Sequence, residues 1–247
     1  MKILGIDIGG SGIKGGIVNT KSGKLISQKI RFETPSPSSP KKVIKKIKKN
    51  IIKELDWNKY VGCGFPGIVM KNKIITAANV SNKWVGVDVS KRISRKTGCE
   101  SFILNDADAA GLAEMKYGSG KNKKGTVLMI TVGTGLGTSI FIDGKLIPNI
   151  EFGHLKMYGD CAEKYASNLV RKELDLSIND WCSRFNEYIK YVEDLISPDL
   201  IIFGGGISKY FSEYNSLLKS RSKILPAKLE NDAGIIGAAL YTSLSLE

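Results

Sequence analysis

The sequence predicts an α/β protein made of two related halves, and three observations support this prediction. Segments typical of buried strands alternate with segments typical of helices along the 247 residues. Three strand-like segments end in glycine-rich turns, at residues 9–16, 133–137 and 204–206. The first two turns each lead into another strand, so the order strand, glycine turn, strand occurs twice. A repeated supersecondary unit of this kind indicates two related lobes that face each other.

The composition is that of a globular protein with a sizeable core, because 42% of the residues are hydrophobic and 25% are charged. No apolar run approaches the roughly 18 residues that a membrane span needs. Met1 leads straight into the first strand, so we expect no signal peptide and a cytoplasmic location. The four cysteines are widely spaced, which argues against a disulfide framework or a cysteine-rich zinc site. Because His154 is the only histidine, a histidine-rich metal cluster is excluded.

The net charge of +13 has two explanations that the sequence leaves open. One is a polyanionic partner, such as nucleic acid, an anionic membrane surface or a phosphate-rich substrate. The other is a lysine-rich proteome that gives its proteins lysine-rich surfaces. Net charge bears on association and solubility, and it says nothing about the fold.

The first strand and its turn, residues 2–16, carry the residue types of a phosphate-and-magnesium loop. Glycines let the backbone approach a ligand and offer its N–H groups. Ser11 adds a hydroxyl group and Lys14 a positive charge, while Asp7 can hold a metal ion directly or through water. The same turn fits the dinucleotide fingerprint Gly10-x-Gly12-x-x-Gly15, which requires a helix after it. The chain continues instead through a turn cluster at residues 19–24 into another expected strand at residues 25–30. This argues against a dinucleotide site and leaves a phosphate loop or a plain hairpin turn.

The segments after this turn are expected in the following order. Residues 2–32 suggest three antiparallel strands, and the proline-rich residues 34–40 suggest a stiff extended linker. Ser39 can cap the next helix, with Pro40 at its first position. That helix has an apolar face formed by Val43, Ile44, Ile47, Ile51, Ile52 and Leu55, and its lysines are Lys41, Lys42, Lys45, Lys46, Lys48, Lys49 and Lys53. The lysines are either the solvated face of an ordinary packed helix or an electrostatic guide for a polyanion.

Strands and helices then alternate to the end of the chain. Strands are expected at residues 60–65, 101–104, 126–131, 139–142 and 199–203, with an extended hairpin at 68–75 and a polar loop containing Trp84 at 77–84. Helices are expected at residues 89–97, from 105 onward, at 161–174, at 178–196 and at 233–246. The last helix contains the small residues Gly234, Gly237, Ala238 and Ala239, which permit close helix packing.

In these segments the chain resembles the ROK family of sugar kinases, within the actin-like ATPase superfamily, and the polyphosphate glucokinase branch most of all. The matching motifs lie at residues 7–14, 34–37, 64–67, 76–80 with Trp84, 105–114, 133–137, 148–154, 204–209 and 226–239, in the family's order and over nearly the whole chain. The resemblance implies two actin-like (ribonuclease H-like) lobes around a central cleft. Residues 1–105 and the helix at 233–247 would form the small lobe, and residues 106–232 the large lobe.

The resemblance also implies which residues bind the phosphoryl donor, which would be polyphosphate or ATP with Mg²⁺ as cofactor. The first two glycine turns would hold the phosphates, and the third would lie by the nucleotide in relatives that use ATP. The implied donor residues are Gly9, Gly10, Ser11, Gly12, Lys14, Gly133, Thr134, Gly135, Gly137, Gly204, Gly205 and Gly206. Asp7 would hold Mg²⁺, directly or through water.

Asp106 is the candidate catalytic base, because a sugar hydroxyl is a poor nucleophile and needs a carboxylate within hydrogen-bond reach. It follows a strand at the start of a helix, where its ionised form is favoured. The implied sugar ligands are Asn79, Asn105, Glu151, His154 and Glu163. Many ROK kinases hold a structural zinc with the equivalent of His154 and a cysteine cluster. Only Cys161 of such a cluster is present here, so we expect no zinc site.

The predicted function is phosphorylation of glucose at its 6-hydroxyl by inorganic polyphosphate, with ATP as a second donor, to give glucose 6-phosphate. The alternatives are a strictly ATP-dependent ROK kinase for glucose or another hexose, and a non-enzymatic polyanion-binding protein. ROK repressors carry an N-terminal helix-turn-helix, whereas this chain begins at the phosphate strand. We therefore expect glucose and polyphosphate as partners, no nucleic acid or membrane, and a homodimer.

Overall fold

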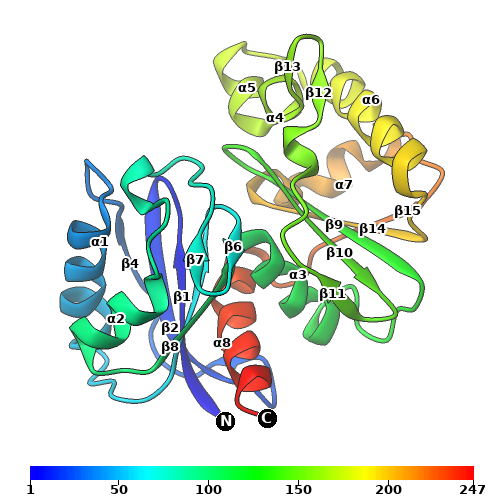
Figure 1. Ribbon diagram of the computed structural model, residues 1–247. Helices are drawn as coiled ribbons and strands as arrows, with labels where there is room; N and C mark the ends of the chain where they lie inside the picture. Colours follow the sequence, from blue (N-terminus) through cyan, green and yellow to red (C-terminus); the bar gives the residue numbers. More distant parts are fainter. The chain divides into compact units, whose positions relative to one another are not determined.

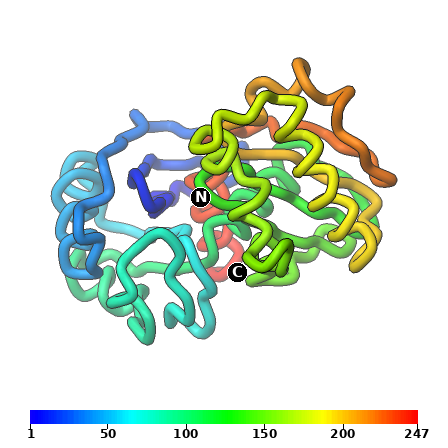
Figure 2. The backbone as a smooth tube through the Cα atoms, turned by 90° about the horizontal axis from the view of Figure 1, so that it is seen from above, coloured from blue at the N-terminus to red at the C-terminus, as the bar shows by residue number.

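The computed structural model describes all 247 residues and divides into two compact units. The first unit comprises Met1–Ala113 and Asp232–Glu247, and the second comprises Glu114–Asn231. The sequence placed the boundary before the helix that begins at Asp106, whereas the structure divides the chain inside that helix. The two chain termini lie close together in both views (Figure 1 and Figure 2), and Ser243 Oγ contacts Met1 Sδ at 3.8 Å.

The first unit is built on one mixed sheet. Its strands are β1 (Lys2–Ile8), β2 (Gly12–Asn19), β3 (Lys24–Leu25), β4 (Ile30–Glu33), β5 (Val61–Phe65) and β8 (Ser101–Asn105). The order is β3-β2-β1-β5-β8, and β4 also pairs with β2. β1 and β2 are antiparallel, whereas β1, β5 and β8 are parallel to one another. The carboxyl ends of these three parallel strands therefore meet at one edge of the sheet.

The second unit repeats this topology. Its strands are β9 (Thr126–Val132), β10 (Leu136–Ile142), β11 (Lys145–Ile147), β14 (Leu200–Gly204) and β15 (Lys223–Pro226), in the order β11-β10-β9-β14-β15. The first three strands are antiparallel neighbours, and β9, β14 and β15 are parallel. In both units the first strand is central and its antiparallel partner follows a glycine turn. The predicted repeat of strand, glycine turn and strand is thus the start of a repeated sheet.

Helices cover both faces of the first sheet (Figure 1). α1 (Pro40–Ile47), the π-helical turn η1 (Lys48–Ile52) and α2 (Val89–Thr97) lie on one face, and α8 (Ala233–Ser245) lies on the other beside α3 (Asp106–Tyr117). The short hairpin of β6 (Val69–Met70) and β7 (Lys73–Ile74) and the 3-10 turn η2 (Asn82–Trp84) connect β5 to α2. The second unit has α4 (Glu163–Ala166), α5 (Asn168–Glu173), α6 (Ile178–Ile196) and α7 (Phe211–Tyr214).

Short segments complete the second unit. They are η3 (Phe152–His154), β12 (Lys156–Met157), β13 (Asp160–Cys161), η4 (Gly206–Tyr210) and η5 (Asn215–Leu217), while η6 (Glu230–Asp232) leads into α8. None of the helices combines the length and the apolar character required to cross a bilayer.

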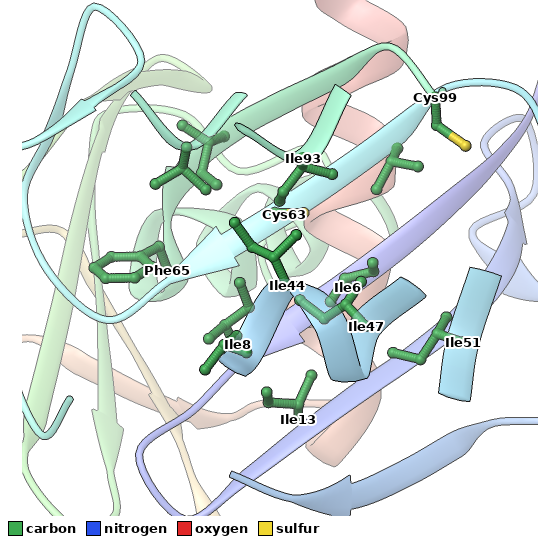
Figure 3. Close-up of a cluster of buried hydrophobic side chains, with 14 of the residues drawn as sticks. Ile6, Ile8, Ile13, Ile44, Ile47, Ile51, Cys63, Phe65, Ile93 and Cys99 are labelled. Atoms are coloured by element: carbon green, nitrogen blue, oxygen red, sulfur yellow. The ribbon is translucent and has the colours of Figure 1, made fainter. Parts of the chain in front are cut away.

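The core of the first unit lies between its sheet and the helices α1 and α2. Ile6 and Ile8 of β1 meet Ile44, Ile47 and Ile51 there, as Figure 3 shows, and all are at least 96% buried. The apolar spacing that predicts α1 is therefore the face that packs on the sheet. Trp84, expected in a polar loop, is fully buried in this core and donates Nε1–H to the Ser38 carbonyl at 2.7 Å.

The core of the second unit is aromatic and lies under α6. Trp181 stacks on Phe185 with ring centroids 5.0 Å apart, and Phe203 and Tyr214 meet the Trp181 ring edge-on. The Trp181 indole N–H reaches the Ala166 carbonyl at 2.9 Å, so its one polar atom is satisfied. Burying such aromatic surface stabilises the unit, although the buried Tyr188 hydroxyl in the same core has no hydrogen-bond partner.

α8 packs unusually close to the first sheet because glycines remove side chains from the contact. A Cβ at Gly5 of β1 would overlap the Ile235 carbonyl oxygen, and one at Gly62 of β5 would overlap that of Ala238. On the other side of α8, a Cβ at Gly237 would overlap the Ala109 carbonyl of α3. Of the small residues expected in the last helix, Gly237 permits close packing against α3, whereas the close contact with the sheet depends on Gly5 and Gly62 of the strands.

Three predicted elements differ in detail from those observed. Residues 25–30 do not form one strand, because β3 ends at Leu25 and β4 begins at Ile30. The helix expected at 161–174 is two short helices, since Ser167 is extended and caps α5 through Val170 N. Ser39 precedes α1, but its side chain makes no capping bond. Local patterns located these segments but did not reveal where tertiary contacts interrupt them.

We predict that Gly5→Ala lowers the free energy of unfolding by about 3 kcal/mol or more, because its Cβ meets the rigid backbone of α8. Gly16→Ala is the matched control in the same sheet, since its Cβ meets only the flexible end of Leu25. Urea unfolding followed by circular dichroism measures both variants. A Gly5→Ala protein as stable as the Gly16→Ala protein would contradict the close-packing argument.

Candidate active site

The phosphate turn of the first unit, residues 9–12, closes on itself at the end of β1. Gly9 N donates to the Gly12 carbonyl at 2.9 Å, and Thr34 holds the turn from outside. The Thr34 hydroxyl donates to the Gly9 carbonyl at 2.6 Å, and its N–H donates to the Ser11 carbonyl at 3.2 Å. Gly10 and Ser11 are exposed. Three of the turn's carbonyls, those of Gly9, Ser11 and Gly12, are therefore bound within the protein while its tip faces solvent.

Asp7 of β1 is separated from this turn by Ile8, and it is the partner of Lys14 on the neighbouring strand β2. Lys14 Nζ lies 3.2 Å from Asp7 Oδ2, and the two side chains are 24% and 18% exposed. α8 begins against the same carboxylate, because a Cβ at Gly234 would stand 2.9 Å from Asp7 Cγ. Lys14 thus neutralises Asp7, and its contact with a donor phosphate stays a prediction.

Asn79 lies against the phosphate turn. A Cβ at Gly10 would stand 2.8 Å from the Asn79 carbonyl oxygen, so only glycine fits there. Asn79 itself is exposed and has the left-handed backbone conformation, with φ of 57°. Asparagine tolerates this conformation better than most residues. The predicted sugar ligand and the predicted donor turn are therefore in direct contact within the first unit.

Asn105 and Asp106 form the junction between β8 and α3. Asn105 Oδ1 accepts from Ala107 N at 2.8 Å and from Asp108 N at 3.0 Å, and its Nδ2 donates to the Gly67 carbonyl at 3.1 Å. This buried amide caps α3 and joins it to the loop after β5, a structural role in addition to the predicted sugar contact. Asp106 is half-buried at the amino end of the helix, where the helix dipole favours a carboxylate.

Asp106 lies at the same sheet edge as the phosphate turn. β1, β5 and β8 are neighbouring parallel strands, so about two strand spacings, roughly 10 Å, separate the end of β8 from the end of β1. Gly64 of the strand between them leaves room, since its Cβ would stand 3.4 Å from Asp106 Cα. The structure therefore gathers Asp7, the phosphate turn, Asn79 and Asp106 at one edge of the first unit.

The second unit places its own glycine turn at the equivalent end of β9. Gly133 N donates to the Gly135 carbonyl at 3.0 Å, and Leu169 N of α5 donates to the Gly133 carbonyl at 3.1 Å. A Cβ at Gly205 would overlap the backbone of Val132, so the third glycine turn lies beside the second. Thr134 is exposed at the tip, while Gly137 already belongs to β10. Gly204 ends β14 and Gly206 begins η4, where its Cβ position is open.

Three of the predicted sugar ligands gather near this second turn. A Cβ at Gly135 would overlap Glu163 Oε2, and His154 Nδ1 lies 3.8 Å from Glu151 Oε2. Thr138 fixes the segment before His154, because its hydroxyl donates to the Ile150 carbonyl at 2.7 Å and accepts from Phe152 N at 3.0 Å. These contacts leave two carboxylates and one imidazole in the same region of the second unit.

Burial raises the pKa of Glu151 above its ordinary value, with nearby Glu163 acting in the same direction and His154 against it. A carboxylate in this state is poorly solvated and gains from hydrogen-bond donors such as sugar hydroxyl groups. Such a site suits a neutral polyhydroxy ligand.

The residues near His154 do not fit a zinc ion. Nowhere in the chain do three or more His, Cys, Asp or Glu side chains form a group that could hold a metal. Cys161 is half-buried on β13, and burial is the main cause that raises the pKa of its thiol. One histidine and one cysteine cannot complete the four ligands of a structural zinc.

Two residues near the first turn were not assigned a role from the sequence. Thr34 was noted only as part of a proline-rich motif, although it forms the clamp on the turn. The Arg31 guanidinium flanks Gly12, since Nε lies 3.5 Å from the position of a Cβ there. The motif at residues 34–37 was the sequence signal that could have pointed to Thr34. No sequence signal pointed to Arg31, whose place beside Gly12 depends on the pairing of β2 with β4.

The duplicated sheet topology, with a glycine turn after the first strand of each unit, defines a member of the actin-like ATPase class. The chain belongs to the ROK family, whose model matches residues 3–170. It is 44% identical over 238 residues to polyphosphate glucokinase of Mycobacterium tuberculosis, covering 96% of this chain and 89% of that protein. It is 43% identical to polyphosphate glucokinase of Mycobacterium leprae, covering 97% and 74% of the two chains.

A solved structure resembles the whole chain as well. The crystal structure of inorganic polyphosphate/ATP-glucomannokinase from Arthrobacter sp. strain KM matches with a TM-score of 0.95 and 44% identity, covering 99% of each chain. The predicted family and the predicted actin-like fold are confirmed by these matches.

We predict that the contribution of Glu151 to the free energy of unfolding falls as the pH rises from the pKa of this group in the unfolded chain through its higher pKa in the folded protein. The folded state holds this proton more tightly than the unfolded chain, so ionisation costs folding free energy at neutral pH. Glu151→Gln removes that cost, and its stability gain over the wild type should be larger at pH 7.5 than at pH 4.5. Urea unfolding at both pH values measures it, with the exposed Glu173→Gln as control. A gain that does not change with pH would contradict the assignment.

Proposed function

We propose that this chain transfers a phosphoryl group from inorganic polyphosphate to the 6-hydroxyl of glucose, with ATP as a second donor. The observation that carries the proposal is the 44% identity to a polyphosphate glucokinase over 96% of the chain. The name of the similar Arthrobacter enzyme includes both polyphosphate and ATP, which supports two donors. The same name, glucomannokinase, favours mannose as a second acceptor sugar.

Asp106 is the base in the proposed reaction. It accepts the proton of the sugar hydroxyl as that oxygen forms its bond to phosphorus, and the bridging P–O bond to the remaining donor breaks. It stands at the amino end of α3, where the helix dipole favours negative charge, and half-burial leaves it accessible to a ligand. Asn105 fixes the start of α3 and thereby the direction of this carboxylate.

The glycine turns would hold the donor phosphates through backbone N–H groups. In the first unit Thr34 donates hydrogen bonds to the carbonyl oxygens of Gly9 and Ser11, so these oxygens point toward Thr34 and away from a phosphate bound to the N–H groups. Asp7 fits a Mg²⁺ ion, because this ion keeps several waters and needs only one or two carboxylates beside the phosphates. Bound there, Mg²⁺ would neutralise charge that develops on the transferred group.

The proposed sugar ligands are Asn79 and Asn105 within the first unit, and Glu151, His154 and Glu163 within the second. Each carboxylate accepts hydrogen bonds from hydroxyl groups, and the imidazole can donate or accept.

Two further proposals, on location and on oligomeric state, come from the sequence. A cytoplasmic location is supported by four free thiols, and a homodimer remains a prediction.

We predict that Asp106→Asn lowers kcat at least about 10³-fold with either donor, because the amide cannot accept the hydroxyl proton. The KM for glucose should change little, since the side chain keeps its shape. A coupled assay for glucose 6-phosphate measures both, with the exposed Asp175→Asn as control. No product from either donor with the wild-type protein would sink the function, and a near-normal rate with Asp106→Asn would sink the base assignment.

We predict that Thr34→Val raises the KM for the phosphoryl donor about tenfold, because the Gly9 carbonyl loses its hydrogen bond and the turn loosens. The KM for glucose should change less than that for the donor. Thr34→Ser retains the hydroxyl and should restore the donor KM. If the serine variant is as impaired as the valine variant, the hydroxyl is not the group that positions the turn.

A further inference from the structure

The net positive charge of the chain lies mostly in the first unit. The first unit holds 21 basic and 10 acidic residues, a net charge of +11, whereas the second holds 16 and 14, a net charge of +2. Both units are rich in basic residues, but the second unit offsets nearly all of them with acidic residues. The positive charge that acidic residues do not offset therefore lies in the first unit.

Two adjacent helices carry the excess. Between Pro40 and Lys53, through α1 and η1, the chain has seven lysines and no acidic residue, and α2 has Lys91, Arg92, Arg95 and Lys96 without an acidic residue. These 11 cations equal the whole net charge of the unit. α1 and α2 lie on the same face of the sheet (Figure 1), and Lys48 Nζ donates to the Lys96 carbonyl at 2.8 Å. We call the solvent side of α1, η1 and α2 the basic face.

Most of this charge is not compensated within the protein. Lys41, Lys45, Lys49 and Lys53 are exposed, follow one another at intervals of four residues, and make no hydrogen bond or ion pair through their side chains. Like charges at this spacing repel each other on a helix. The one ion pair on the basic face joins Lys91 to Asp88, the cap of α2, at 3.7 Å. The face therefore keeps a repulsion that an anionic ligand would relieve.

The basic face is hollowed beside α2. Lys91, Arg92 and Arg95 line a shallow depression together with Asp88 and residues 85–87. Guanidinium groups bind phosphate oxygens through two parallel hydrogen bonds, so this hollow suits phosphate groups better than a row of lysines alone.

The basic face is also linked to the phosphate turn within the same unit. Thr34 holds Gly9 of the turn, and α1 begins six residues later at Pro40. Six residues span at most about 20 Å. A long polyanion with one end at the turn can therefore reach the start of α1.

We propose that the basic face binds the distal part of an inorganic polyphosphate chain whose reacting end is held at the phosphate turn. This inference rests on the proposed function, because it names where the donor of that reaction continues beyond the reacting phosphates. The basic face holds the donor through many exposed contacts, so it acts on affinity for long chains and leaves the chemical step alone.

The test neutralises three lysines of the basic face in one protein, which we call the basic-face variant: Lys41→Gln, Lys45→Gln and Lys49→Gln. The matched control neutralises three exposed lysines of the second unit, Lys145→Gln, Lys172→Gln and Lys190→Gln. Fluorescence anisotropy with labelled long-chain polyphosphate, without sugar, measures binding across salt concentrations. We expect about tenfold weaker binding at low salt for the first variant only, and a salt dependence shallower by roughly 2 in log–log slope.

Kinetics give the second readout. The KM for long-chain polyphosphate should rise about tenfold in the basic-face variant, while kcat and the KM values for ATP and tripolyphosphate stay unchanged. Binding and kinetics that match the control variant would overturn the inference. So would equally tight, lysine-dependent binding of duplex DNA or of phosphatidylserine vesicles. If no donor supports transfer but long polyphosphate binding still depends on these lysines, the proposed reaction fails and the binding surface stands.

Discussion

The close contact between α8 and the first sheet is the constraint on which the candidate site depends. Gly5 and Gly62 lack the side chains that would hold the helix away, and Gly237 lets α3 approach from its other side. Because α8 lies this close, its first turn reaches Asp7 through Gly234. The same contact ties α3, whose first residue is Asp106, to the sheet edge. The carboxylate proposed to hold a metal ion and the carboxylate proposed to accept a proton are thus held by one packing arrangement.

One topology serves both units, yet their glycine turns have different surroundings. The turn of the first unit is clamped by Thr34 and touches Asn79, so the proposed donor turn contacts a proposed sugar ligand. The turn of the second unit is touched by Glu163 and by Gly205. Burial keeps the pKa of Glu151 high in that region. The repeated sheet supplies backbone N–H groups twice, and the attached loops decide which further chemistry each unit provides.

The distribution of charge adds to what the total charge shows. Both units contain many basic residues, but the second offsets nearly all of them with acidic residues, whereas the first keeps a net charge of +11. The apolar side of α1 is packed on the sheet, so its helical form does not depend on the lysines. The repulsion between these lysines lowers the stability of the helix only slightly compared with the free energy gained by burying Ile44, Ile47 and Ile51.

The sequence by itself determined the family, the alternation of strands and helices, and the glycine turns, because these depend on local periodicity and on residue types in a fixed order. It located α2 at its observed bounds for the same reason. It did not determine that β3 ends after Leu25, that Trp84 is a core residue, or that Lys14 pairs with Asp7. The roles of Thr34 and Arg31 were equally hidden. Only the tertiary structure decided these points, because each depends on atoms that strand pairing and helix packing bring together from distant parts of the chain.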